Sequence, residues 1–71
     1  MNEYNIVNPL YLNYIPDDKK EQYHYNLTVD VFYFYNGYKP TEKQRIVYID
    51  GNIFNLSKKN LKLLTNPLII F

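Results

Sequence analysis

The chain has 71 residues, no Cys and a formal net charge of +1. This length allows one domain with a small core, so we expect a stability of only a few kcal/mol. The lack of Cys excludes a disulfide framework and a thiolate metal site. The apolar runs are too short to span a bilayer, and the N-terminus lacks a basic signal-peptide region, so we expect a cytoplasmic protein with no membrane partner.

The charge is distributed unevenly along the chain. Residues 1–35 carry two basic against five acidic side chains, and residues 36–71 carry six against two. Small DNA-binding domains usually have a larger basic excess, because they neutralise phosphates. The charge therefore argues against a dedicated DNA-binding domain.

The N-terminal half contains two segments of mixed character. Residues 4–16, YNIVNPLYLNYIP, combine β-branched and aromatic residues with Asn and Pro, which predicts one or two short extended segments ending at Pro16. In residues 16–26, Pro is followed by acidic residues and then by Lys. This order fits a helix N-terminus or a charged hairpin loop, and both alternatives stay open.

The next segments favour strands. Residues 27–35, LTVDVFYFY, alternate and have high β propensity, so the residues themselves predict a strand. NGYKP, at residues 36–40, is typical of a turn. Residues 45–49, RIVYI, followed by Asp-Gly-Asn and IFNL at 53–56, predict a hairpin. The apolar tail is interrupted by Pro67.

Residues 34–65 also carry a longer pattern. An aromatic-Asn-Gly turn and a Pro precede Ile-Asp-Gly-Asn at 49–52, and Asn-Leu-Lys-Leu-Leu-Thr follows at 60–65. This run resembles the homing-endonuclease branch of the HNH family, of the ββα-metal type. The resemblance implies an α+β fold of short antiparallel strands with an HNH-like Ω-loop, and a C-terminal helix that is truncated or absent. It also implies that residues 26–35 are helical, against the propensity, and this conflict stays open.

The resemblance divides a single domain, 1–71, into an N-terminal strand or helix segment, 1–33, and an HNH-like segment, 34–71. Short polar side chains in the second segment are expected to hydrogen-bond the loop backbone, and Gly51 permits a positive φ. These structural loop residues are Asp50, Gly51, Asn52, Asn55 and Asn60.

The catalytic parts of the family are missing. The base position falls on Tyr48, a phenol that stays protonated at neutral pH, and the first metal-ligand position falls on Val47, which has no donor atom. Pro67 obstructs the helix that would bring the second ligand. We therefore expect a degenerate HNH endonuclease-like protein that is not an enzyme and holds no metal and no cofactor.

No other group of residues suggests catalysis. His24 is the only His, and a lone His is more often a structural residue than a catalyst. Asp17, Asp18 and Glu21 form the only carboxylate cluster, which we interpret as solvated charges at a helix start.

Three function hypotheses follow. The first is a phage or mobile-element protein that binds a protein partner and modulates or inhibits a host nuclease or defence factor. Its candidate partner-binding residues are Tyr4, Tyr11, Tyr14, Tyr23, Tyr25, Tyr33 and Tyr35. The second is a DNA-binding remnant, with candidate phosphate-binding residues Lys43, Arg45, Lys58, Lys59 and Lys62. The third is a residual metal-dependent nuclease completed by a partner chain.

Overall fold

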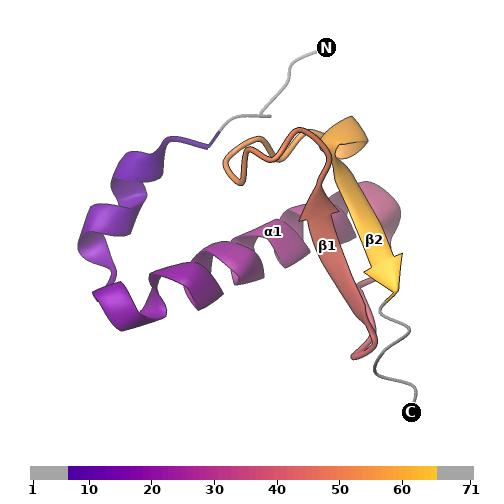
Figure 1. Ribbon diagram of the computed structural model, residues 1–71, viewed down its shortest axis with the longest axis horizontal. Helices are drawn as coiled ribbons and strands as arrows, with labels where there is room; N and C mark the ends of the chain where they lie inside the picture. The colour runs from indigo at the N-terminus through magenta and orange to yellow at the C-terminus, as the bar shows by residue number, and fades with distance from the viewer. Residues whose placement is uncertain (1–6, 66–71) are drawn as a thin grey trace.

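The structure is a computed structural model that describes residues 7–65. Within these residues it has one α-helix, α1 (Lys20–Asn36), and a two-stranded antiparallel sheet of β1 (Gln44–Tyr48) and β2 (Leu61–Thr65). The 3₁₀ helices η1 (Pro9–Tyr14) and η2 (Asp17–Lys19) precede α1, and η3 (Lys58–Asn60) leads into β2. The predicted α+β class with antiparallel strands is confirmed. In Figure 1, α1 crosses behind the β1–β2 hairpin.

The N-terminal segment differs from the extended conformation predicted for residues 4–16. The side chain of Asn8 accepts a hydrogen bond from the backbone N–H of Leu10 at 2.9 Å, and Pro9 occupies the first position of η1. An Asn cap and the fixed φ of proline together start a helical turn. The extended prediction is therefore wrong for residues 9–14, and its first residues, 4–6, lie outside the described residues.

Of the two alternatives for residues 16–26, the helix is the one formed. Pro16 leads into η2, whose first residues are Asp17 and Asp18, and α1 begins directly after it. Acidic side chains at this end of a helix interact favourably with the partial positive charge of its unpaired N–H groups.

The strand prediction for residues 27–35 is wrong, because this segment lies wholly in α1. The helix implied by the HNH resemblance is the conformation observed. His24, Thr28 and Phe32, four residues apart, are all buried on the side of α1 that faces the hairpin. Packing along one helix face outweighs the β propensity of Val, Phe and Tyr, which is a weak effect per residue. The helix ends at Gly37, whose φ is +80°.

The sheet contains the predicted first strand and a different second one. Ile46 lies opposite Leu63, and Tyr48 lies opposite Leu61. IFNL, at residues 53–56, belongs to the loop between the strands, so its prediction as the returning strand is wrong. Leu56 is buried in the core from this loop, which explains why the segment is apolar without being a strand.

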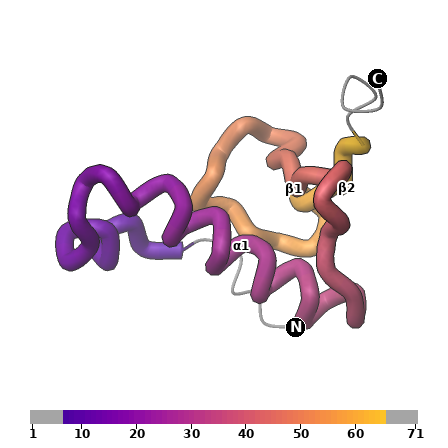
Figure 2. Tube along the Cα trace, turned by 90° about the horizontal axis from the view of Figure 1, so that it is seen from below, coloured from indigo at the N-terminus to yellow at the C-terminus, as the bar shows by residue number. Residues whose placement is uncertain are grey.

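The core lies between α1 and the hairpin and is small. Its buried apolar members within residues 7–65 are Phe32, Ile46, Leu56 and Leu61. Three structural units therefore meet there: α1, the two strands and the loop that connects them. Figure 2, seen from below, shows that the hairpin and its loop cover α1 from one side only.

Candidate functional site

The loop of residues 49–60 is held by its own Asp and Asn side chains. The Asp50 carboxylate accepts from the N–H of Asn52 at 2.7 Å and from the side-chain amide of Asn55 at 2.8 Å. The Asn52 side chain accepts from the N–H of Phe54 at 3.0 Å. Gly51 has φ +78°, a conformation that favours glycine. These bonds satisfy backbone groups that have no strand partner.

Asn60 joins the two ends of the loop. Its side-chain oxygen accepts from the N–H of Asp50 at 2.8 Å, and its side-chain amide donates to the carbonyl of Asn55 at 2.8 Å. Its backbone carbonyl accepts from the N–H of Ile49 at 2.9 Å. The residue is only 6% exposed, so these bonds are shielded from water. All five predicted loop residues thus lie in one hydrogen-bonded loop.

Asp50 is expected to make the stability of this loop depend on pH. The side-chain amide of Asn55, and then the N–H of Asn52, lower the pKa of the Asp50 carboxyl by hydrogen bonding. A carboxyl whose pKa is lower in the folded state stabilises it above the unfolded pKa and loses this effect as pH falls through the folded pKa. We expect the melting temperature to fall on acidification below about pH 5 and to continue falling below about pH 3.9, because the folded-state pKa lies under the ordinary carboxyl value.

Thermal unfolding followed by circular dichroism at several pH values checks this expectation. Asp50→Asn should flatten part of the acid slope. The matched control Asp18→Asn should keep the wild-type slope, because the Asp18 side chain makes no hydrogen bond or ion pair within residues 7–65. Equal slopes for wild type and Asp50→Asn would contradict the role given to this carboxylate.

Tyr48, which the HNH resemblance matches to a base position, points toward α1. Its hydroxyl lies 2.7 Å from the Thr28 hydroxyl, which itself donates to the carbonyl of His24 at 3.1 Å. Since Thr28 has one proton to donate, Tyr48 is the donor in the first bond. Burial raises the pKa of Tyr48, although the bond to Thr28 opposes the shift. This phenol is therefore protonated at neutral pH. Val47 lies on the opposite face of β1, across from Lys62.

His24 is a structural junction. Its Nε2 lies 2.6 Å from the carbonyl oxygen of Ile53, so this nitrogen carries a proton, and its Nδ1 accepts from the hydroxyl of Tyr11 at 2.5 Å. Phe54 meets the ring edge-on at 4.9 Å between centroids. The imidazole therefore ties η1, α1 and the loop together.

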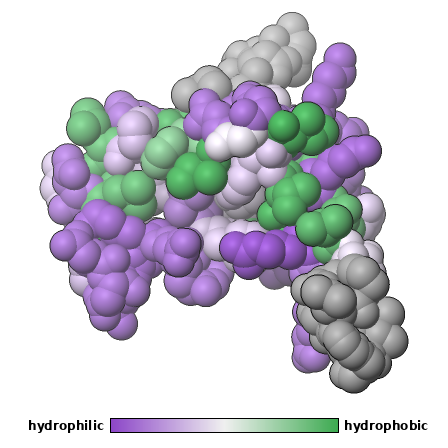
Figure 3. Space-filling view, in the orientation of Figure 1, coloured by the Kyte–Doolittle hydropathy of each residue, from purple (hydrophilic) through white to green (hydrophobic). Residues whose placement is uncertain are grey.

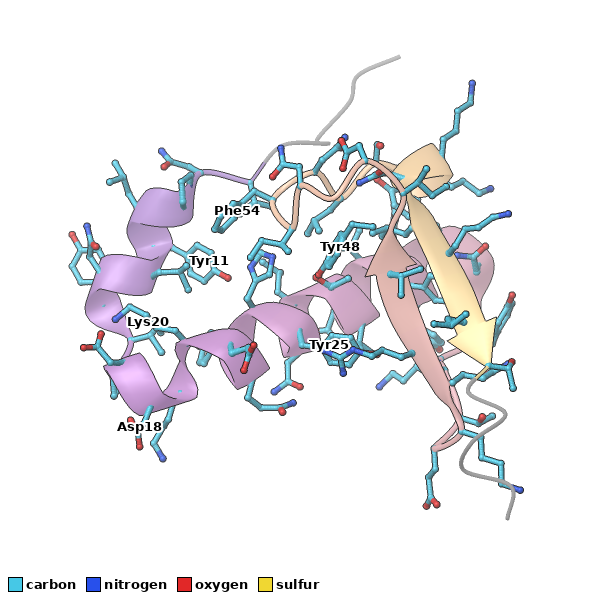
Figure 4. All side chains as sticks on the ribbon, viewed as in Figure 1. Tyr11, Asp18, Lys20, Tyr25, Tyr48 and Phe54 are labelled. Carbon is cyan, nitrogen blue, oxygen red and sulfur yellow. The ribbon has the colours of Figure 1, made fainter. Side chains whose placement is uncertain are left out.

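A cleft of about 300 Å³ lies beside this junction. Figure 4 shows Tyr11 and Tyr48 pointing into the region between η1, α1 and the loop. At the β1 side of the cleft the Arg45 guanidinium lies 4.4 Å from the centroid of the Tyr25 ring, and the Tyr25 hydroxyl accepts from the N–H of Ile46 at 3.1 Å. The lining is mainly apolar, and its tyrosine hydroxyls already have partners. Lys20, Glu21 and Arg45 bring charged groups to the same lining.

The predicted partner-binding tyrosines separate into two groups. Tyr11, Tyr25 and Tyr35 are partly buried. Tyr14, Tyr23 and Tyr33 are exposed by 87%, 53% and 50%, and Tyr4 lies outside the described residues. The sequence prediction missed Phe34, which is 83% exposed. The i, i+4, i+7, i+11 spacing of Tyr23, Leu27, Asp30 and Phe34 was the available signal.

The predicted phosphate-binding residues lie on the hairpin side. Arg45 and Lys62 start from the same face of the sheet, because Arg45 pairs with Leu64 and Lys62 pairs with Val47. The Arg45 guanidinium, however, folds over the Tyr25 ring of α1. Lys58 and Lys59 are exposed in η3, and Lys43 is exposed just before β1. The face of the molecule in Figure 3 shows hydrophobic residues in separate groups among hydrophilic ones.

Within residues 7–65, no helix is long and apolar enough to cross a membrane. In the same residues, no three His, Asp or Glu side chains are grouped so that they could hold a metal ion. Compared with protein-family models, curated proteins and solved structures, the chain shows no match.

Proposed function

We propose that this chain is a non-catalytic, HNH-like protein of phage or mobile-element origin that binds a protein partner, as a modulator or inhibitor of a host nuclease or defence factor. The observation that carries the proposal is the exposure of Tyr23, Tyr33 and Phe34 on the side of α1 that faces away from the hairpin. Exposed aromatic side chains of this kind are enriched at interface hot spots. A partner that covers them gains hydrophobic free energy.

Two features support the HNH-like and non-catalytic parts of this proposal. The residues that the resemblance matches in the loop are the ones that hydrogen-bond it, and Asn60 joins its two ends. The Tyr48 hydroxyl donates a hydrogen bond to Thr28, and its raised pKa keeps it protonated at neutral pH, so it is not available as a base. Val47 offers no atom to a metal. These two features support an HNH-like loop that has neither a base nor a metal ligand at the matched positions.

The charge on α1 favours a protein over nucleic acid at this face. Asp30 is exposed on this face, and a negative side chain repels phosphates. The aromatic side chains therefore suit a protein surface.

Replacing Phe34 by Ala is expected to weaken partner binding about thirtyfold, equivalent to about 2 kcal/mol, as for a typical hot-spot aromatic. The melting temperature should change little, because the side chain is 83% exposed. The measurement is the affinity of the purified chain, by biolayer interferometry, for the protein that it captures from host lysate.

Tyr14→Ala is the matched control, since Tyr14 is 87% exposed but lies in η1. It should keep wild-type affinity. Full affinity of the Phe34→Ala variant, or a chain that captures no protein, would contradict the proposal.

A DNA-binding remnant is the second candidate, favoured by the exposed Lys58 and Lys59 of η3 and the exposed Lys62 of β2. A gel shift on duplex and single-stranded DNA tests it. Binding that falls steeply with salt and disappears when Lys58, Lys59 and Lys62 are all changed to Ala would establish this function and overturn the first.

A further inference from the structure

We propose that a hollow on the outward face of α1 receives an arginine side chain of the protein partner. The hollow has a volume of about 290 Å³ and is lined by Tyr23, Asn26, Leu27 and Asp30. This inference rests on the proposed function and specifies the chemistry of the surface that the partner must present.

The spacing of the lining residues places them together. They occupy positions i, i+3, i+4 and i+7, which lie on one face of an α-helix. The buried residues His24, Thr28 and Phe32 lie on the opposite face, against the hairpin. The view from below in Figure 2 shows no helix or strand of the described residues covering α1 from its outer side. The hollow is therefore accessible to another protein.

The polar groups of the hollow are acceptors that suit a cation. Within residues 7–65 the Asp30 carboxylate has no hydrogen bond or ion pair, and the ion pair in that part of the chain joins Lys20 and Asp17. The side-chain oxygen of Asn26 accepts from the side-chain amide of Gln22 at 2.8 Å and keeps a second lone pair. A guanidinium can donate to both acceptors, because its N–H groups form a planar fork.

The apolar groups of the hollow suit the rest of an arginine side chain. Leu27 is partly buried and can contact the methylene stem, and the exposed Tyr23, which also lines the hollow, supplies an aromatic ring on which a guanidinium can stack. An aliphatic side chain beside a carboxylate and an aromatic ring thus matches a long side chain with a terminal cation.

Phe34 indicates that the arginine belongs to a protein. It lies one turn after Asp30, about 6 Å along the helix axis, and its ring is 83% exposed. A partner that fills both places must present an arginine beside an apolar side chain. A second copy of α1 fits less well as the partner. If two copies paired by a twofold axis through this face of the helix, their Asp30 carboxylates would lie near each other and repel.

The test is a titration of the full chain, labelled with ¹⁵N, with N-acetyl-arginine amide, followed by NMR chemical shifts. We expect saturable shifts centred on residues 23–30, with an affinity in the millimolar range. N-acetyl-citrulline amide, a neutral isostere, should bind at least about tenfold more weakly, as should N-acetyl-arginine amide to Asp30→Asn. N-acetyl-arginyl-leucine amide should bind more tightly than the single residue, and Phe34→Ala should remove that gain.

Asp18→Asn is the matched control, since it removes one exposed negative charge outside the hollow. It should leave the titration unchanged. Tyr23→Leu is a second variant at the hollow and should also weaken binding. Equal binding of arginine and citrulline, equal loss in Asp18→Asn and Asp30→Asn, or shifts centred elsewhere would overturn the inference. Self-association of the chain that depends on Phe34 would overturn it in favour of a second copy.

The two proposals can fail separately. Capture of a protein partner that is unaffected by Asp30→Asn would leave the proposed function in place and remove the arginine site. Saturable arginine binding without any protein partner would leave the arginine site in place and remove the proposed function.

Discussion

Asn60→Ala is expected to lower the free energy of unfolding by about 3 kcal/mol. The change removes the partners of the Asp50 N–H and the Asn55 carbonyl, and an unpaired buried group costs about 1–3 kcal/mol. A domain of 71 residues has a total stability of about 4–10 kcal/mol at typical values per residue. The variant should therefore be close to unfolding at physiological temperature.

Urea denaturation followed by circular dichroism measures this loss. Asn52→Ala is the matched control in the same loop, because Asn52 is exposed and accepts a single backbone hydrogen bond with its side chain. Its loss should be about 1 kcal/mol or less. Equal midpoints for the two variants would mean that Asn60 does not hold the loop ends together.

Leu56→Ala is expected to cost about 2–5 kcal/mol, the usual range for removing a buried Leu side chain and leaving a cavity. Leu56 is almost completely buried and packs with Phe32, Ile46 and Leu61. Because the core has so few members, the neighbours have little means of filling the space. The same urea experiment measures this change.

Leu64→Ala provides the comparison for Leu56→Ala. It is the same substitution at an exposed position in β2, and it should cost about 0.5 kcal/mol or less. A Leu56→Ala variant as stable as Leu64→Ala would show that the loop does not pack into the core as described.

The loop and the first strand could be predicted because their causes are local. Ile46 and Val47 are β-branched, and the Asp and Asn residues of the loop bond to groups a few positions away. Such bonds follow from residue type and spacing. The sequence predicts the returning strand at IFNL, because an apolar segment buried from a loop and one buried in a strand have the same composition.

The helix could not be predicted from propensity, because its cause is distant in sequence. Thr28 meets Tyr48, twenty positions away, and this contact requires the hairpin to be in place. Only with the hairpin present does burial of one face of residues 20–36 outweigh the β propensity of the segment. In a strand, successive side chains point to opposite faces. A strand prediction therefore does not reveal that Phe34 lies on the same helix face as Tyr23.

The sequence alone also does not predict the roles of individual tyrosines. Tyr11 and Tyr25 were predicted to face a partner, but their hydroxyls bond to His24 and to the N–H of Ile46. Those bonds join residues 13 and 21 positions apart. Composition indicates how many aromatic side chains a small core cannot hold, and only the fold determines which ones stay outside.

The loop of residues 49–60 implies an order of events during folding. The hydrogen bond that joins Asp50 to Asn60 spans ten positions, whereas the bonds that dock α1 on the hairpin span twenty or more. Short segments close at a lower entropic cost, and local contacts form faster than distant ones. The hairpin and its loop can therefore assemble before the helix docks, and the outward aromatic face of α1 takes its fixed place only when that last step is complete.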